Sequence, residues 1–118
     1  MFMPKPLLVI LALITLIFSS FVTLYINNAF VKSPSKSEIE TAINQAQYFY
    51  RQKKGRGEDL STGPCLTESL MPDWVVDIVH NPRQPIDDLG ENQCQSFREG
   101  RSKHFVELDL NGNLVKVK

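Results

Sequence analysis

The chain has 118 residues, and its 13 Lys and Arg residues balance its 13 Asp and Glu residues. This balance supplies no basic field of the kind that nucleic-acid binding requires, so we expect no nucleic-acid partner. The ordinary content of Gly and Pro favours a folded domain over a disordered chain, and a domain this small needs an additional staple.

Residues 7–26, LLVILALITLIFSSFVTLYI, form an uncharged apolar run. At about 1.5 Å per helical residue the run is roughly 30 Å long, which matches the hydrocarbon core of a bilayer. It is longer than a signal-peptide core, and no small-x-small cleavage triplet stands near its end. We therefore expect an uncleaved signal-anchor, with a cleaved secretory signal peptide as the alternative.

The expected organisation, from the N-terminus, is a cytoplasmic tail, the transmembrane segment, a linker and one extracytoplasmic domain, at residues 1–6, 7–26, 27–36 and 37–118. Charge alone does not orient the segment, because Lys5 on one side faces Lys32 and Lys36 on the other. A cysteine pair in the domain favours an oxidising space. The expected location is thus the cell membrane, single-pass, with the N-terminus inside and the C-terminal domain outside.

A second helix is predicted over residues 37–54. Ser35 stands three residues before Glu38, which is the spacing of a capping box. Apolar side chains then recur at steps of three and four, which places on one stripe Ile39, Ala42, Ile43, Ala46, Phe49 and Tyr50. We expect this stripe to pack on the domain's own sheet; the alternatives are a second chain or the lipid surface.

Strands are predicted at residues 74–79, 103–110 and 114–117, where apolar and polar side chains alternate. Asn111-Gly112 predicts a tight hairpin turn with two positive φ angles. A calcium loop around Asp109 is the weaker alternative, because Lys118 stands where a Glu ligand is needed. The fold class is therefore α+β, with the helix packed on a small antiparallel sheet around Ile39, Ile43, Ala46, Phe49 or Tyr50, Trp74, Val76, Ile78, Val106 and Leu108.

Cys65 and Cys94 enclose a proline-rich stretch, and we expect a structural disulfide between them. Closing a loop of about 30 residues contributes roughly 3.5 kcal/mol in the loop-entropy model. A zinc site with His80 and His104 is the alternative, although the chain has no C-x-x-C or H-x-x-x-H pair. We expect no metal and no cofactor.

The order of these elements resembles that of type IV pilins and the pseudopilins of secretion systems. Those proteins have an N-terminal apolar helix that runs into an amphipathic helix, then a small antiparallel sheet and often a disulfide. Residues 42–55, AINQAQYFYRQKKG, are similar to the helix end before the loop in that family. The resemblance implies a filament or secretion-system subunit, but the chain lacks the prepilin cleavage motif and Pro34 interrupts the helix.

No acid, base and nucleophile cluster in the sequence, so a non-enzymatic interaction or assembly module is expected, with the lipid bilayer and a protein partner or a second copy as its contacts. The expected contact surface is the loop 81–92, through Arg83, Asp87 and Asp88, because rigid exposed loops lose little entropy on binding. The alternative is a small enzyme or metal-binding domain that uses Asp77, His80, Asp87 and Asp88.

Overall fold

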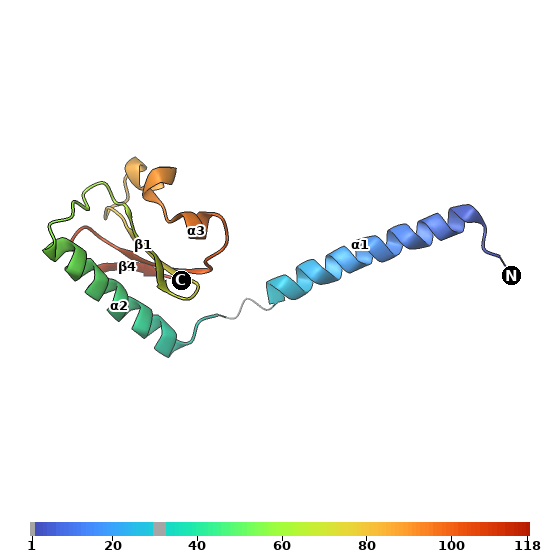
Figure 1. The fold of residues 1–118 in the computed structure, drawn as a ribbon, viewed down its shortest axis with the longest axis horizontal. Helices are drawn as coiled ribbons and strands as arrows, with labels where there is room; N and C mark the ends of the chain where they lie inside the picture. The colour runs from blue at the N-terminus through green and yellow to red at the C-terminus, as the bar shows by residue number, and fades with distance from the viewer. Residues whose placement is uncertain (1, 30–32) are drawn as a thin grey trace. The chain divides into compact units, whose positions relative to one another are not determined.

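The computed structural model describes residues 2–29 and 33–118, and its contacts divide the chain into two units, Met1–Pro34 and Ser35–Lys118. The first unit consists mainly of α1 (Lys5–Ala29), whose span Lys5–Asn27 is long and apolar enough to cross a membrane (Figure 1). The helix continues beyond the expected end at residue 26. Part of the expected linker, residues 30–32, lies outside the described residues.

Three hydroxyl groups within α1 bond to the helix itself. Thr15, Ser20 and Thr23 donate to backbone carbonyls three or four residues earlier, at 2.8 to 2.9 Å. These three hydroxyl groups are thereby satisfied without water, as a lipid environment requires.

The second unit opens with α2 (Lys36–Gly55), which confirms the predicted amphipathic helix. Ser35 is its N-cap, and its hydroxyl accepts the backbone N–H of Glu38 at 3.1 Å. In a capping box the Glu38 carboxylate would turn back to Ser35. It instead accepts the indole N–H of Trp74 at 2.9 Å and so ties the first turn of the helix to the sheet.

Four strands form one sheet in the order β1 (Cys65–Met71), β2 (Trp74–Ile78), β3 (His104–Leu108) and β4 (Leu114–Val117). The α+β class is confirmed, but the sheet is mixed. The pairs β1–β2 and β3–β4 are antiparallel, whereas β2 and β3 are parallel, so the expectation of an antiparallel sheet is wrong at its centre. The reason is the long connection between Ile78 and His104, which returns β3 in the direction of β2.

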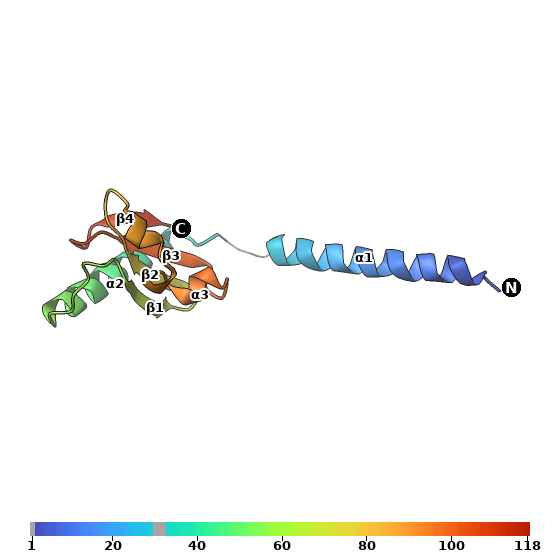
Figure 2. The same ribbon diagram turned by 90° about the horizontal axis from the view of Figure 1, so that it is seen from above.

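That connection contains three short helices, η1 (Pro85–Asp88), η2 (Gly90–Asn92) and α3 (Gln95–Arg98). The sequence predicted only loop there, and it also predicted no strand at β1. Figures 1 and 2 show α2 along one face of the sheet and α3 on the other side. The sheet is therefore covered on both faces.

The main core lies between α2 and the sheet. Its fully enclosed members include Ala42, Ala46, Trp74, Val76, Ile78, Val106 and Leu108, all 0% exposed. Ile43, which was expected in the core, is only half-buried, because the buried stripe is centred on Ala42, Ala46 and Tyr50. Alanines at the centre let the helix approach the sheet closely.

The β3–β4 hairpin forms as expected, but its turn differs from the predicted one. Only Gly112 has a positive φ, at 83°, and Asn111 does not. The Asp109 carboxylate accepts hydrogen bonds from the backbone N–H groups of Asn111 and Asn113 at 2.8 and 2.9 Å, and these bonds stabilise the turn. Gly112 also lies under Tyr50, whose ring would be 2.6 Å from an added Cβ.

Candidate functional site

A pocket of about 310 Å³ lies on the face of the sheet opposite α2. Its floor consists of alternate residues of the two central strands, Val75, Asp77, Phe105 and Glu107. Its walls come from the connection between those strands and include Arg83, Phe97 and Arg98. Pockets of about 300 Å³ and above are of the size that holds small ligands, so this is the candidate site.

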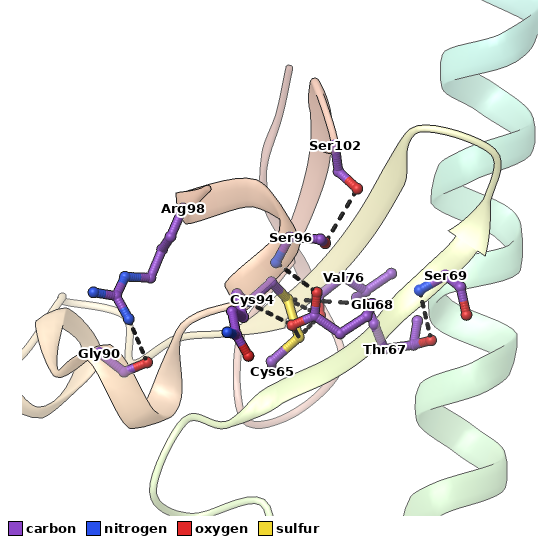
Figure 3. The surroundings of a disulfide bond; sticks show 11 residues. Cys65, Thr67, Glu68, Ser69, Val76, Gly90, Cys94, Ser96, Arg98 and Ser102 are labelled. Carbon is purple, nitrogen blue, oxygen red and sulfur yellow. Dashed lines mark hydrogen bonds between the residues drawn. A yellow bond between two sulfur atoms is a disulfide. The ribbon is translucent and has the colours of Figure 1, made fainter. Parts of the chain in front are cut away.

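A disulfide holds the wall of the pocket on the sheet. Cys65 at the start of β1 is bonded to Cys94, which precedes α3 and is 3% exposed, so the predicted pairing is confirmed. Glu68 adds a second tie, because its carboxylate accepts the backbone N–H groups of Gln95 and Ser96 at 2.5 and 2.8 Å (Figure 3). Burial raises the pKa of Glu68, but hydrogen bonds from the side chain and backbone of Ser96 and from the backbone of Gln95 outweigh it and hold the pKa below its ordinary value.

The zinc alternative finds no support in the positions of its four residues. The two sulfur atoms are bonded to each other, and a disulfide offers no thiolate to a metal. His80 follows β2 and bonds to Asp87, whereas His104 begins β3 and packs against Trp74 with the rings tilted by 35° and 4.9 Å between their centroids.

Asp87 is an internal structural residue, which corrects its expected place in an exposed contact loop. It is 1% exposed. Its carboxylate accepts hydrogen bonds from the ring Nδ1–H of His80 at 2.8 Å and from the backbone N–H groups of His80 and Gln84 at 3.1 and 2.8 Å. Burial raises the pKa of Asp87, but the hydrogen bonds from Gln84 and His80 more than offset it, and the pKa is lowered.

Gly63 leaves the space that this carboxylate occupies. An added Cβ there would stand 2.6 Å from Asp87 Oδ1 and 3.0 Å from the carbonyl oxygen of Ile78, and the φ of Gly63 is +71°. Both observations favour glycine at this position.

Arg83 and Asp88 do lie at the surface, as the sequence predicted. Their side chains are 43% and 65% exposed, and the Arg83 Nε donates to Asp88 Oδ1 at 3.0 Å. Arg83 also reaches Glu107, with 3.4 Å between Nη1 and Oε1. The four residues of the enzyme alternative are thus distributed: Asp77 lines the pocket, His80 and Asp87 bond to each other, and Asp88 pairs with Arg83.

Asp77 has the most perturbed environment in the pocket. Its Oδ1 atom is buried and has no hydrogen-bond partner among the described residues. Burial raises the pKa of Asp77 to about 8, the nearby Glu107 carboxylate adds to the rise, and Arg83 opposes it. Asp77 and Glu107 are register partners on the parallel strands, so two carboxyl groups stand side by side.

The unfolding free energy should therefore decrease between pH 5 and pH 8. In this window the unfolded chain has lost the Asp77 proton, with a pKa of 3.8, whereas the folded domain retains it up to about pH 8. Folding then takes up a proton, so rising pH destabilises the folded state by up to about 1.4 kcal/mol per pH unit. Urea titrations followed by the fluorescence of Trp74, the only tryptophan, would measure this slope.

Asp77→Asn should flatten this pH dependence and be more stable than the wild type at pH 8. Asp88→Asn is the matched control, because it removes the same charge from an exposed side chain. Equal slopes for the wild type and Asp77→Asn would show that Asp77 does not retain its proton in the folded domain.

The sequence pointed to Asp77 and Arg83 but missed Glu107, Phe97, Phe105 and Arg98. Glu107 carried no signal of its own, because it meets Asp77 only through the parallel register of β2 and β3. Comparisons with protein-family models, with curated proteins and with solved structures give no match to this chain.

Proposed function

We propose that the chain is a membrane-anchored extracytoplasmic module that holds a partner molecule without transforming it. The apolar helix α1 supports the anchor, since its span Lys5–Asn27 is long enough to cross a bilayer. The Cys65–Cys94 disulfide supports an oxidising location for the domain, with the N-terminus on the cytoplasmic side.

The pocket is the observation that carries the binding role. It is open, is built on two rigid central strands and has an exposed aromatic wall, Phe97, which is 39% exposed. Arg83 and Asp88 form an exposed ion pair at its edge. Such a preformed face binds with little loss of conformational entropy.

The chemistry of the pocket favours holding over catalysis. Among the described residues that line it, two are carboxylic acids and none offers a free thiol, an imidazole or a hydroxyl nucleophile. His80, which lies in the connection, donates its ring N–H to buried Asp87. A relay of nucleophile and base therefore has no obvious members at this face.

Crosslinking in native membranes tests this function. A membrane-impermeant, amine-reactive crosslinker is added to intact cells or spheroplasts, and the captured proteins are identified for the wild type, Arg83→Ala and Phe97→Ala. Both variants should lower partner capture at least fivefold, while Gln45→Ala, on the exposed side of α2, should not. Trp74 fluorescence would verify that each variant remains folded.

Two results would contradict the proposal. Capture of the same partner at undiminished yield by every variant would remove the pocket face from the interaction. A reaction that requires cell lysis would place the domain on the cytoplasmic side. Capture of only a second copy of the chain would favour the filament or secretion-system subunit.

A further inference from the structure

The floor of the pocket carries two neighbouring carboxyl groups. In the parallel register Val75 pairs with Phe105 and Asp77 pairs with Glu107, so one aromatic and two acidic side chains share one face. The connection between the strands forms the wall of the pocket above this face through Phe97 and Arg98. The floor therefore presents hydrogen-bond acceptors beside an apolar surface.

Three cations lie around the pocket, but only one of them, Arg83, forms an ion pair with either acid among the described residues. Arg83 is the one cation among the described residues within 4.0 Å of Glu107, and it is shared with Asp88. Arg98 donates to the carbonyl oxygen of Gly90 at 3.3 Å (Figure 3). Lys116 faces the same side of the sheet from β4, but its Nζ lies over the Phe105 ring, 5.7 Å from the centroid. No described cation forms an ion pair with Asp77.

The aromatic side chains suit a cation with an apolar stem. Phe97 and Phe105 pack edge to face, with 4.9 Å between centroids and an interplanar angle of 77°. Aromatic faces attract ammonium groups, and an ammonium carries three donors and no acceptor. A hydroxyl would bring one donor, and an ionised carboxylate would bring none.

We propose that this pocket binds a primary alkylammonium group, with the charged end between Asp77 and Glu107 and the stem against Phe97 and Phe105. The source is either a lysine side chain of a partner protein or a free amine, which share this chemistry. The inference rests on the proposed function, because it names the ligand class of the same face.

Binding should be linked to proton release from Asp77. A neutral Asp77 attracts an ammonium weakly, and the arriving cation stabilises the ionised form. The other charged groups toward this face are Glu107, Arg83, Arg98 and Lys116, and Asp87 lies near enough to raise the pKa of Asp77 slightly. The apparent Kd should therefore decrease at least tenfold from pH 6 to pH 9, while an alkylamine remains protonated.

The full chain in maltoside micelles can be titrated with n-butylammonium and, as a neutral match, n-butanol. We expect backbone amide NMR shifts at Val75, Asp77 and Glu107 with n-butylammonium, and at least tenfold weaker binding in Asp77→Asn and Glu107→Gln. Glu40→Gln, an exposed acid on α2, should bind as the wild type does. A peptide, acetyl-Gly-Lys-Gly-amide, that binds more tightly than n-butylammonium would identify the source as a protein, and the reverse order would identify a free amine.

Equal shifts from n-butylammonium and n-butanol, unchanged binding by Asp77→Asn and Glu107→Gln, or stronger shifts from butyrate would overturn the proposal. The crosslinking result is independent of this titration. If Phe97→Ala lowers partner capture but the wild type does not bind n-butylammonium, only the proposed ligand class is wrong. If Phe97→Ala captures the partner at undiminished yield, the proposed function is wrong.

Discussion

Ala46→Asp should unfold most of the domain, whereas Gln45→Asp should leave it folded. Ala46 is 0% exposed and lies between α2 and the sheet, so an Asp side chain there buries a carboxylate without a partner. Burying this carboxylate lowers the free energy of unfolding by more than about 4 kcal/mol, which is most of the stability of a small domain. Gln45, one residue earlier, is exposed on the other side of the helix.

Urea titration of the two variants, followed by Trp74 fluorescence, checks this result. Trp74 is itself 0% exposed in the same core, so its emission reports the loss of packing directly. Both variants place the same residue in the same helix, so helix propensity does not distinguish them. If both unfolded at one urea concentration, the stripe of α2 would not be the buried face.

Removal of the disulfide should lower the unfolding free energy by about 2–5 kcal/mol. The bridge spans a sequence separation of 29 residues and holds the connection against Val75 and Phe105. Without it the unfolded chain gains entropy and the wall of the pocket loses its covalent tie. Cys65→Ser/Cys94→Ala is the suitable variant, because Cys94 is buried and a hydroxyl there would have to find a partner.

A thiol reductant provides the matched control for this variant. It should destabilise the wild type by a similar amount and leave Cys65→Ser/Cys94→Ala unchanged. Alkylation of both cysteines in the folded, untreated protein would contradict the bridge. Ligand binding to the reduced protein should also weaken, since Phe97 and Arg98 follow Cys94 closely in the chain.

The sequence alone determined the features that depend on local physics. The length of the apolar run defines α1, the Ser35 cap and the apolar spacing define α2, and alternation defines β2, β3 and β4. The disulfide followed because two cysteines allow one intramolecular pairing. Each of these predictions rests on neighbours within a few residues or on simple counting.

Only the tertiary structure decided the direction of β3, the strand β1 and the burial of Asp87. The residue types at 79–103 indicate turns but do not determine the path of the chain. The parallel pairing of β2 with β3 could therefore not be predicted from the sequence. The sequence around Asp87 is typical of a polar loop, and only the fold brings its carboxylate to the ring and backbone of His80. The candidate site depends on this same long-range path, because Asp77 meets Glu107, and Cys94 brings Phe97 toward Phe105, only once the connection has crossed the sheet.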